Sequence, residues 1–295
     1  MRITNSMLTG NFLRNLNINL NRLAKTQNSL STGKRITVPS DDPVGLVYGM
    51  DIRANMSGVE QYLQNIDAAF SWLEQTDSAL NCATELLHRG KELALYSANE
   101  TLEAQSLEAV AKEVEQLVQE MVQVANTNFA GRYIFAGNKT DVPPFSANGE
   151  YQGSNRERQV EIGVNVTIPY SVTGDQVFGG AGGDGQDVIV VLTLLKNALT
   201  GGSGEQPGDL VGDLDAALDQ IFSCRAEVGA RMNRLELVAN RLETSRLNFT
   251  KVLSQVEDAD LAETIIELKT QENVYRASLA AGARIIQPSL IDFLR

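Results

Sequence analysis

Apolar residues recur at steps of three and four near both ends of this 295-residue chain. Near the start, five leucines form such a stripe: Leu13, Leu16, Leu20, Leu23 and Leu30. Near the end, a strict seven-residue step is kept by Val228, Leu235, Leu242, Phe249 and Val256. A narrow apolar stripe with this period is typical of a helix that packs against other helices. Both ends are therefore predicted to be long helices of coiled-coil type.

Helix-breaking residues divide the helical part of the chain. The first helix is predicted from about residue 6 to Ser31, because Gly33, Pro39 and Pro43 interrupt the pattern that follows. Ser40, Asp41 and Asp42 precede Pro43 as N-cap candidates, and Pro is favoured at the first helical position. A second helix is expected from there to about Ser97. A third should follow a turn at 98–100 and stop before Asn126.

The pattern changes to period two after the third helix. Val160, Ile162, Val164, Val166 and Ile168 alternate with polar residues or glycine, which predicts one half-buried strand over 160–168. Shorter strands are expected at 133–135 and 172–178.

Three further features divide the second half of the chain. Asp187 is expected to cap a short helix over 188–199. A glycine-rich loop at 201–208 leads to a long helix that begins near Asp209. A break near 257–260 separates a last helix, which should end before Pro288.

These elements predict a mainly α fold with a small β insert. The long helices from both termini are expected to pair antiparallel, in the manner of a coiled coil, and to form a rod. Three parts are predicted: terminal helices at 1–35 and 257–295, a helical rod at 36–137 and 187–256, and a β-rich inserted domain at 138–186.

The charge of the chain is acidic and unevenly spread. A net charge of −12 opposes non-specific binding to nucleic acid or to an anionic membrane. Residues 1–40 contain no Asp or Glu, whereas 257–295 contains seven acids and four bases. This contrast is either chance variation or the sign of two terminal helices that lie side by side with complementary charge.

The predicted first helix is rich in asparagine, with seven Asn residues between Asn5 and Asn28. Asn is a weak helix former, so a helix of this composition depends on packing. Residues 1–35 are therefore expected to be disordered in the free monomer and helical only after assembly.

The candidate catalytic and ligand motifs are weak. Gly180–Gly185 matches G-x-G-x-x-G, the pattern of a dinucleotide-binding turn. No second parallel strand is predicted after it, and Glu205, at the distance expected for a ribose contact, falls in a loop instead of at a strand end. A flexible turn is therefore the simpler interpretation. The same stretch, from Gly179, resembles one calcium β-roll repeat without a second copy. The acidic run 257–260 is interpreted as charge at a helix start. No catalytic, cofactor-binding or metal-binding residue is predicted.

The remaining chemical groups are few. His88 is the only histidine and is expected on a helix surface, without the partners of a catalytic triad. Cys82 and Cys224 lie on separate predicted helices, where free thiols are expected and a disulfide stays open. Residues 1–6 show no apolar segment of a Sec-type signal peptide, and the apolar run 188–195 is too short to span a bilayer.

Three segments carry a family resemblance. They are Ser29–Ile36 followed by Pro39–Pro43, then Gly131–Gly137, and the tail Arg284–Leu294. The chain resembles the flagellin superfamily over about 1–137 and 209–295, and least in the insert. The loop with Thr32–Arg35 and Pro39–Pro43 favours the members that join hook to filament. The segment 257–287 is more similar to filament flagellin, which stays the alternative.

The resemblance implies a structural, non-enzymatic component of the bacterial flagellum. The expected partners are other copies in a ring, the first hook-associated protein, flagellin and a cytoplasmic export chaperone, with no nucleic acid and no membrane insertion. Export through the flagellar type III apparatus, without a Sec signal, would place the chain outside the cell. A secreted adhesin or enzyme built on the β insert is a second alternative, from a different class.

The resemblance also implies that the terminal helices form the inner tube of the assembly, while the insert faces outward. The apolar positions of the two terminal helices are the expected assembly interface: Leu13, Leu16, Leu20, Leu23, Leu30, Leu261, Ile265, Leu268, Tyr275, Leu279 and Ile286.

Overall fold

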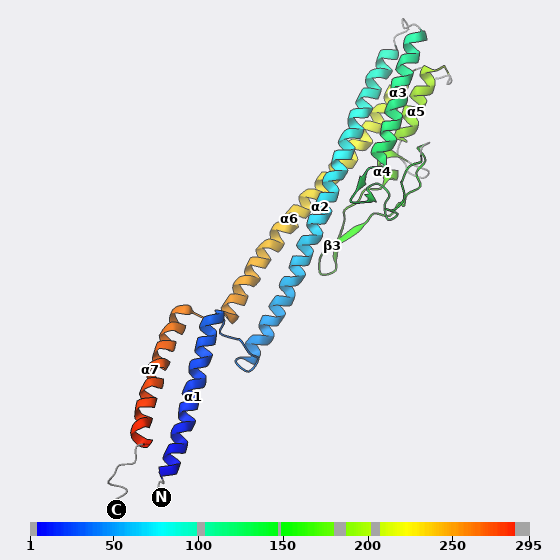
Figure 1. Cartoon of the computed structure of the whole chain (residues 1–295). Coiled ribbons are helices and arrows are strands. Elements are labelled where there is room, and N and C mark those ends of the chain that lie inside the picture. Colours follow the sequence, from blue (N-terminus) through cyan, green and yellow to red (C-terminus); the bar gives the residue numbers. More distant parts are fainter. Residues whose placement is uncertain (1–4, 99–103, 147–148, 180–186, 202–206, 287–295) are drawn as a thin grey trace, which may run out of the picture. The chain divides into compact units, whose positions relative to one another are not determined.

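The computed structural model describes residues 5–98, 104–146, 149–179, 187–201 and 207–286 (Figure 1). Of these described residues, 74% are helical. Within those ranges it contains seven helices and two small antiparallel two-stranded sheets. The predicted mainly α fold class is confirmed. No helix in the described ranges has the length and hydrophobicity that a membrane crossing requires.

The chain forms two compact units. One contains residues 1–58 and 245–295, and the other contains residues 59–244. The long helices α2 (Pro43–Ser97) and α6 (Val211–Glu257) contribute residues to both units. The proposed division into terminal helices, rod and insert stays a prediction.

The core of the larger unit lies along α2 and α6. Two ion pairs, Lys91 with Asp215 and Arg225 with Asp77 at 3.0 Å, show that the two helices run antiparallel. Both helices bury apolar residues completely at a seven-residue step: Leu73, Leu80 and Leu87 on α2, with Leu214, Ile221, Val228 and Leu235 on α6. Of the positions that the seven-residue step marks near the end of the sequence, Val228, Leu235 and Leu242 are buried in this unit.

Two shorter helices pack against each other in the same unit. They are α3 (Ala104–Ala125) and α5 (Val188–Leu199). Asp187 caps α5 as predicted, because its carboxylate accepts hydrogen bonds from the backbone N–H groups of Ile189 and Val190, both at 3.1 Å. Gly90 of α2 lets α5 approach closely, since a Cβ there would lie 2.9 Å from Leu192 Cδ2.

The β-rich region contains two hairpins and a short helix. Strands β1 (Asn128–Phe129) and β2 (Arg132–Tyr133) pair, as do β3 (Gln159–Gly163) and β4 (Val166–Pro169), with Val160 opposite Ile168. The prediction of one strand over 160–168 is wrong, because the chain turns at Val164–Asn165. Asn165 has φ +58°, which Asn tolerates better than most residues. Because the turn has only two residues, the alternation of apolar and polar positions continues through it and resembles a single strand.

The predicted strand over 172–178 is also wrong. Most of this segment is helix α4 (Gly174–Phe178), whose N-cap residue Thr173 forms a capping box with Gln176 in the first turn. This box satisfies backbone groups that a strand would have paired with a neighbouring strand. Phe178 is fully buried against Phe135, with ring centroids 5.2 Å apart, so apolar residues in this segment fill a core without forming a sheet.

Arg231 of α6 links the β-rich region to α6 through hydrogen bonds and ion pairs. Its buried guanidinium donates to the Ser171 carbonyl at 2.8 Å and to the carboxylates of Glu157 at 2.7 Å and Glu227 at 2.5 Å. Charge-assisted hydrogen bonds of this kind are stronger than neutral ones.

The smaller unit contains α1 (Asn5–Thr32) and α7 (Leu261–Ile286), with the first turns of α2 and the last turns of α6. The predicted helix boundaries agree with the observed ones within about two residues. The predicted break is confirmed, since 258–260 separates α6 from α7. Within the acidic run, Asp260 caps α7 by accepting from Ala262 N at 2.8 Å. Glu257 instead ends α6 and is buried, so the interpretation of the whole run as helix-start charge is wrong.

A matched pair of leucines on α6 tests the apolar seam of α2 and α6. Leu235 is fully buried, whereas Leu237 is 71% exposed. We expect Leu235→Ala to lower the free energy of unfolding by about 2–5 kcal/mol, because it leaves a cavity. Leu237→Ala should change it by less than about 0.5 kcal/mol. Equilibrium urea unfolding measures both values, and equal losses would contradict the assignment of the seam.

Candidate assembly site

Helices α1 and α7 lie side by side and antiparallel in the smaller unit (Figure 1). The Phe12 ring packs on Gly282, where a Cβ could not be accommodated. Asn19 Nδ2 donates to Ser278 Oγ at 3.2 Å, and Thr26 Oγ1 donates to Gln271 Oε1 at 3.1 Å. These contacts join the two segments that were expected to form the assembly interface.

The predicted interface residues fall into two groups. Five are partly covered: Leu16, Leu23, Leu30, Leu268 and Tyr275. Five others stay between 44% and 54% exposed: Leu13, Leu20, Leu261, Ile265 and Leu279. Ile286 ends α7, and its side chain lies outside the described part of the structure. The pairing of α1 with α7 therefore covers only part of the predicted interface.

Further apolar side chains were missed by the sequence analysis. Fifteen of the 23 exposed large hydrophobic residues in the described ranges belong to the smaller unit. Besides the five exposed leucines and isoleucines above, they are Met7, Ile18, Val38, Val44, Val47, Tyr48, Met50, Leu247, Ile266 and Val274. The spacing of Val44, Val47 and Tyr48 after Pro43 was the available signal, because it marks one helix face.

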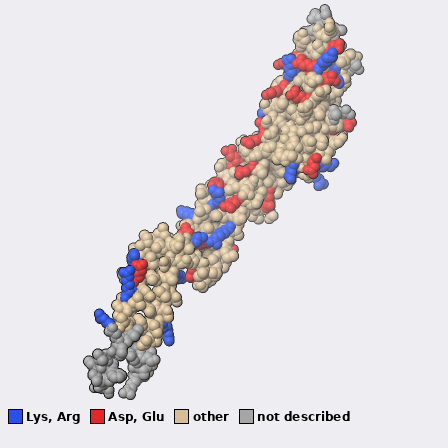
Figure 2. All heavy atoms as spheres, viewed as in Figure 1, with Lys and Arg blue, Asp and Glu red and all other residues tan. Residues whose placement is uncertain are grey.

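This enrichment makes the smaller unit the candidate binding surface. Apolar side chains scattered singly are normal, whereas an accumulation on one part of a protein marks an interaction site. On the face shown in Figure 2, most of the surface over α1 and α7 is uncharged, and charged side chains stand in small groups. The arrangement suits association with other helices.

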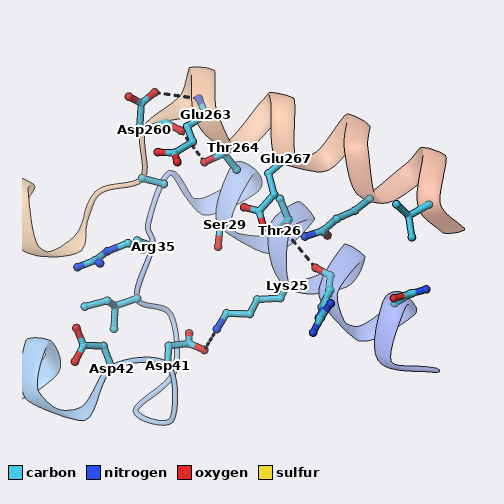
Figure 3. Close-up of a pocket in the computed structure, with 16 residues that line it drawn as sticks. Lys25, Thr26, Ser29, Arg35, Asp41, Asp42, Asp260, Glu263, Thr264 and Glu267 are labelled. Atoms are coloured by element: carbon cyan, nitrogen blue, oxygen red, sulfur yellow. Dashed lines mark hydrogen bonds and ion pairs between the residues drawn. The ribbon is translucent and has the colours of Figure 1, made fainter. Parts of the chain in front are cut away.

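A cavity of about 620 Å³ lies between α1, α7 and the loop that follows α1 (Figure 3). Arg22, Lys25 and Arg35 line it on one side, and Glu263 and Glu267 line it on the other. Basic and acidic side chains therefore face each other across the cavity, although α7 as a whole is not acidic, since it contains three Glu and three Lys or Arg residues. Lys25 is paired with Asp41 of the loop at 2.8 Å, however, and the hydrogen bonds given above between α1 and α7 are neutral.

Two aspartates fix the loop between α1 and α2. The Asp41 carboxylate accepts from the backbone N–H groups of Thr37 and Val38, each at 3.2 Å. Asp42 Oδ1 accepts from Gly45 N at 2.9 Å and so caps α2, as the sequence predicted. The ion pair with Lys25 and these backbone hydrogen bonds lower the pKa of Asp41 to about 2.

The described residues that were considered for chemistry lie apart from one another in the structure. His88 is exposed, and its ring centroid lies 6.4 Å from that of Phe222. Cys82 and Cys224 are free thiols, and burial raises the pKa of both, to about 11 for Cys224. No group of three or more His, Cys, Asp or Glu in the described ranges is placed to hold a metal ion. Gly180–Gly185 and Glu205 lie outside the described residues.

Comparison with known families identifies the class of protein. The bacterial flagellin N-terminal helical region matches residues 3–140, and the flagellin C-terminal helical region matches residues 211–294. The chain belongs to the bacterial flagellin family. It is a flagellin-like structural component of the bacterial flagellum. Members of this family serve motility.

Individual relatives include both hook-associated proteins and flagellins. The chain is 25% identical to the flagellar hook-associated protein 3 of Escherichia coli K12, over 95% of this chain and 96% of that protein. It is 28% identical to the flagellin of Bacillus subtilis 168, over 97% of each. The solved hook associated protein-3 of Legionella pneumophila has the same fold, with a TM-score of 0.62 and 16% identity over 70% of this chain and 98% of that one.

The lowered pKa of Asp41 predicts a pH dependence of stability. Its folded pKa of about 2 is below the ordinary value of 3.8, so the ionised carboxylate stabilises the fold fully above about pH 4. This contribution is lost as the pH falls from about 4 through 2. The urea midpoints of the wild type and of Asp41→Asn should therefore differ at pH 5 and converge near pH 2. A constant difference over this range would contradict the assignment.

Proposed function

We propose that this chain is the subunit of the junction between hook and filament. It forms a ring by self-association and connects the first hook-associated protein to the flagellin filament. The loop between α1 and α2 carries the proposal, because Thr32–Arg35 and Pro39–Pro43 follow the junction pattern more closely than the flagellin pattern. The hook-associated protein 3 of Escherichia coli, which the chain resembles over almost its whole length, supports it.

The exposed residues of α1 and α7 supply the proposed contact between subunits. Leu13, Leu20, Leu261, Ile265 and Leu279 face solvent in the single chain. Covering apolar surface contributes about 25 cal/mol per Å², so helices of neighbouring copies would gain most by packing on these residues. The predicted interface thus divides into positions used within the chain and positions used between chains.

The same surface is the reason to expect a cytoplasmic chaperone as a partner before assembly. An exposed apolar surface is a liability during export, so a cytoplasmic chaperone would cover it until the chain leaves through the flagellar type III apparatus. The chain would then act outside the cell. The asparagine-rich α1 suits a segment that is unfolded in transit and becomes helical on assembly.

Filament flagellin is the second candidate. It is favoured by the 28% identity to the flagellin of Bacillus subtilis, against 25% to the hook-associated protein of Escherichia coli, and by the flagellin-like segment 257–287. Both candidates use the same assembly surface, so the surface does not discriminate between them.

Deleting the gene discriminates between the two candidates. Loss of a junction subunit should leave hooks without filaments, with flagellin shed into the medium, and should abolish swimming. Electron microscopy of the cells and immunoblotting of the medium measure the two effects. Re-expression of the wild-type gene is the control. Filaments of normal length on the deletion strain would contradict the junction role.

A further inference from the structure

Glu257, the last residue of α6, carries a buried carboxylate. The residue is 3% exposed. Its carboxylate receives two cations from distant parts of the chain, Arg53 of α2 at 2.6 Å and Lys34 at 3.2 Å. A carboxylate removed from water is costly unless it is paired and hydrogen-bonded, and here both conditions are met.

Backbone hydrogen bonds align the same two segments. Arg35 N donates to the Glu257 carbonyl at 2.7 Å, and Ala259 N donates to the Gly33 carbonyl at 2.9 Å. Lys34 and Asp258 form an antiparallel bridge between them. The Arg35 guanidinium also donates to the Val256 carbonyl at 3.0 Å. Residues 33–35 are thus joined to residues 256–259 by main-chain and side-chain bonds together.

Two glycines make this arrangement possible. Gly33 has φ +70°, a left-handed conformation that ends α1 and directs the chain toward Glu257. Gly49 of α2 faces the carboxylate, and a Cβ at this position would lie 2.7 Å from Glu257 Oε1. The space for the carboxylate and the turn that brings Lys34 to it are therefore both built into the backbone.

We propose that Glu257 is an electrostatic latch that holds the segment after α1 on the end of α6. Because Lys34 and Arg53 are both cationic, only the carboxylate between them allows the two to be close. The latch fixes where α1 leaves the helical body and therefore which residues of α1 meet α7. It acts within one chain, so it applies to a junction subunit and to a filament subunit alike.

Amide hydrogen exchange on the full chain tests the latch at Arg35 and Ala259, whose N–H groups make the backbone hydrogen bonds between the two segments. Glu257→Gln keeps the shape of the side chain and removes its charge. We expect it to accelerate exchange at both amides about tenfold or more, because two cations are left unpaired. Glu263→Gln is the matched control, since it makes the same change on an exposed residue of α7, and it should leave both rates within about twofold.

Lys34→Met is a milder variant that keeps the Arg53 pair and so protects the test against a failure to fold. It should accelerate the same two amides, and combined with Glu257→Gln it should add little further acceleration, because the two changes remove one interaction. Three results would overturn the latch: unprotected amides at Arg35 and Ala259 in the wild type, equal acceleration by Glu263→Gln, or fully additive effects of the two latch variants.

Discussion

Helices α1 and α7 cannot cover each other completely, and this constraint governs the smaller unit. Neighbouring residues of a helix point about 100° apart, so Ile265 and Ile266 cannot both face α1. On α1, Ile18 and Leu20 are likewise exposed although Leu16 and Leu23 are partly covered. Each helix has apolar side chains on more than one side, and two helices provide only one seam. The surface left over has the right chemistry for further helices, which other copies of the chain can supply.

The larger unit has a different energetic basis. The seam of α2 and α6 buries leucines completely, as at Leu80 and Leu235, and Arg231 ties the β-rich region to α6. Complete burial on a regular period is what makes a helical pair stable by itself. The chain thus combines a unit with its own core and a unit with an incomplete core, and we propose that assembly depends on the second.

The sequence predicted most of the helices because their ends carry local signals: Gly33, Pro43 and the Asp187 cap. The turn at Val164–Asn165 escaped prediction because alternation continues through it, and α4 did so because its apolar residues fit either element. The apolar stripes of α1 and α7 could be read from the sequence, but not which of their positions are covered within the chain and which stay exposed, since a stripe does not reveal its partner. The burial of Glu257 could not be predicted, because Lys34 and Arg53 reach it only through the fold.

The central claim is that other subunits cover the exposed faces of α1 and α7. Cysteine labelling tests it most directly, when it is measured both on the free chain and on isolated flagella. Ile266→Cys and Val164→Cys place thiols at 68% and 78% exposed positions, the second on the hairpin expected to face outward. A maleimide should modify both quickly in the free chain. In isolated flagella we expect the Ile266→Cys thiol to react at least about tenfold more slowly, while the Val164→Cys thiol reacts as before. Equally fast reaction of the Ile266→Cys thiol in both states would contradict the account.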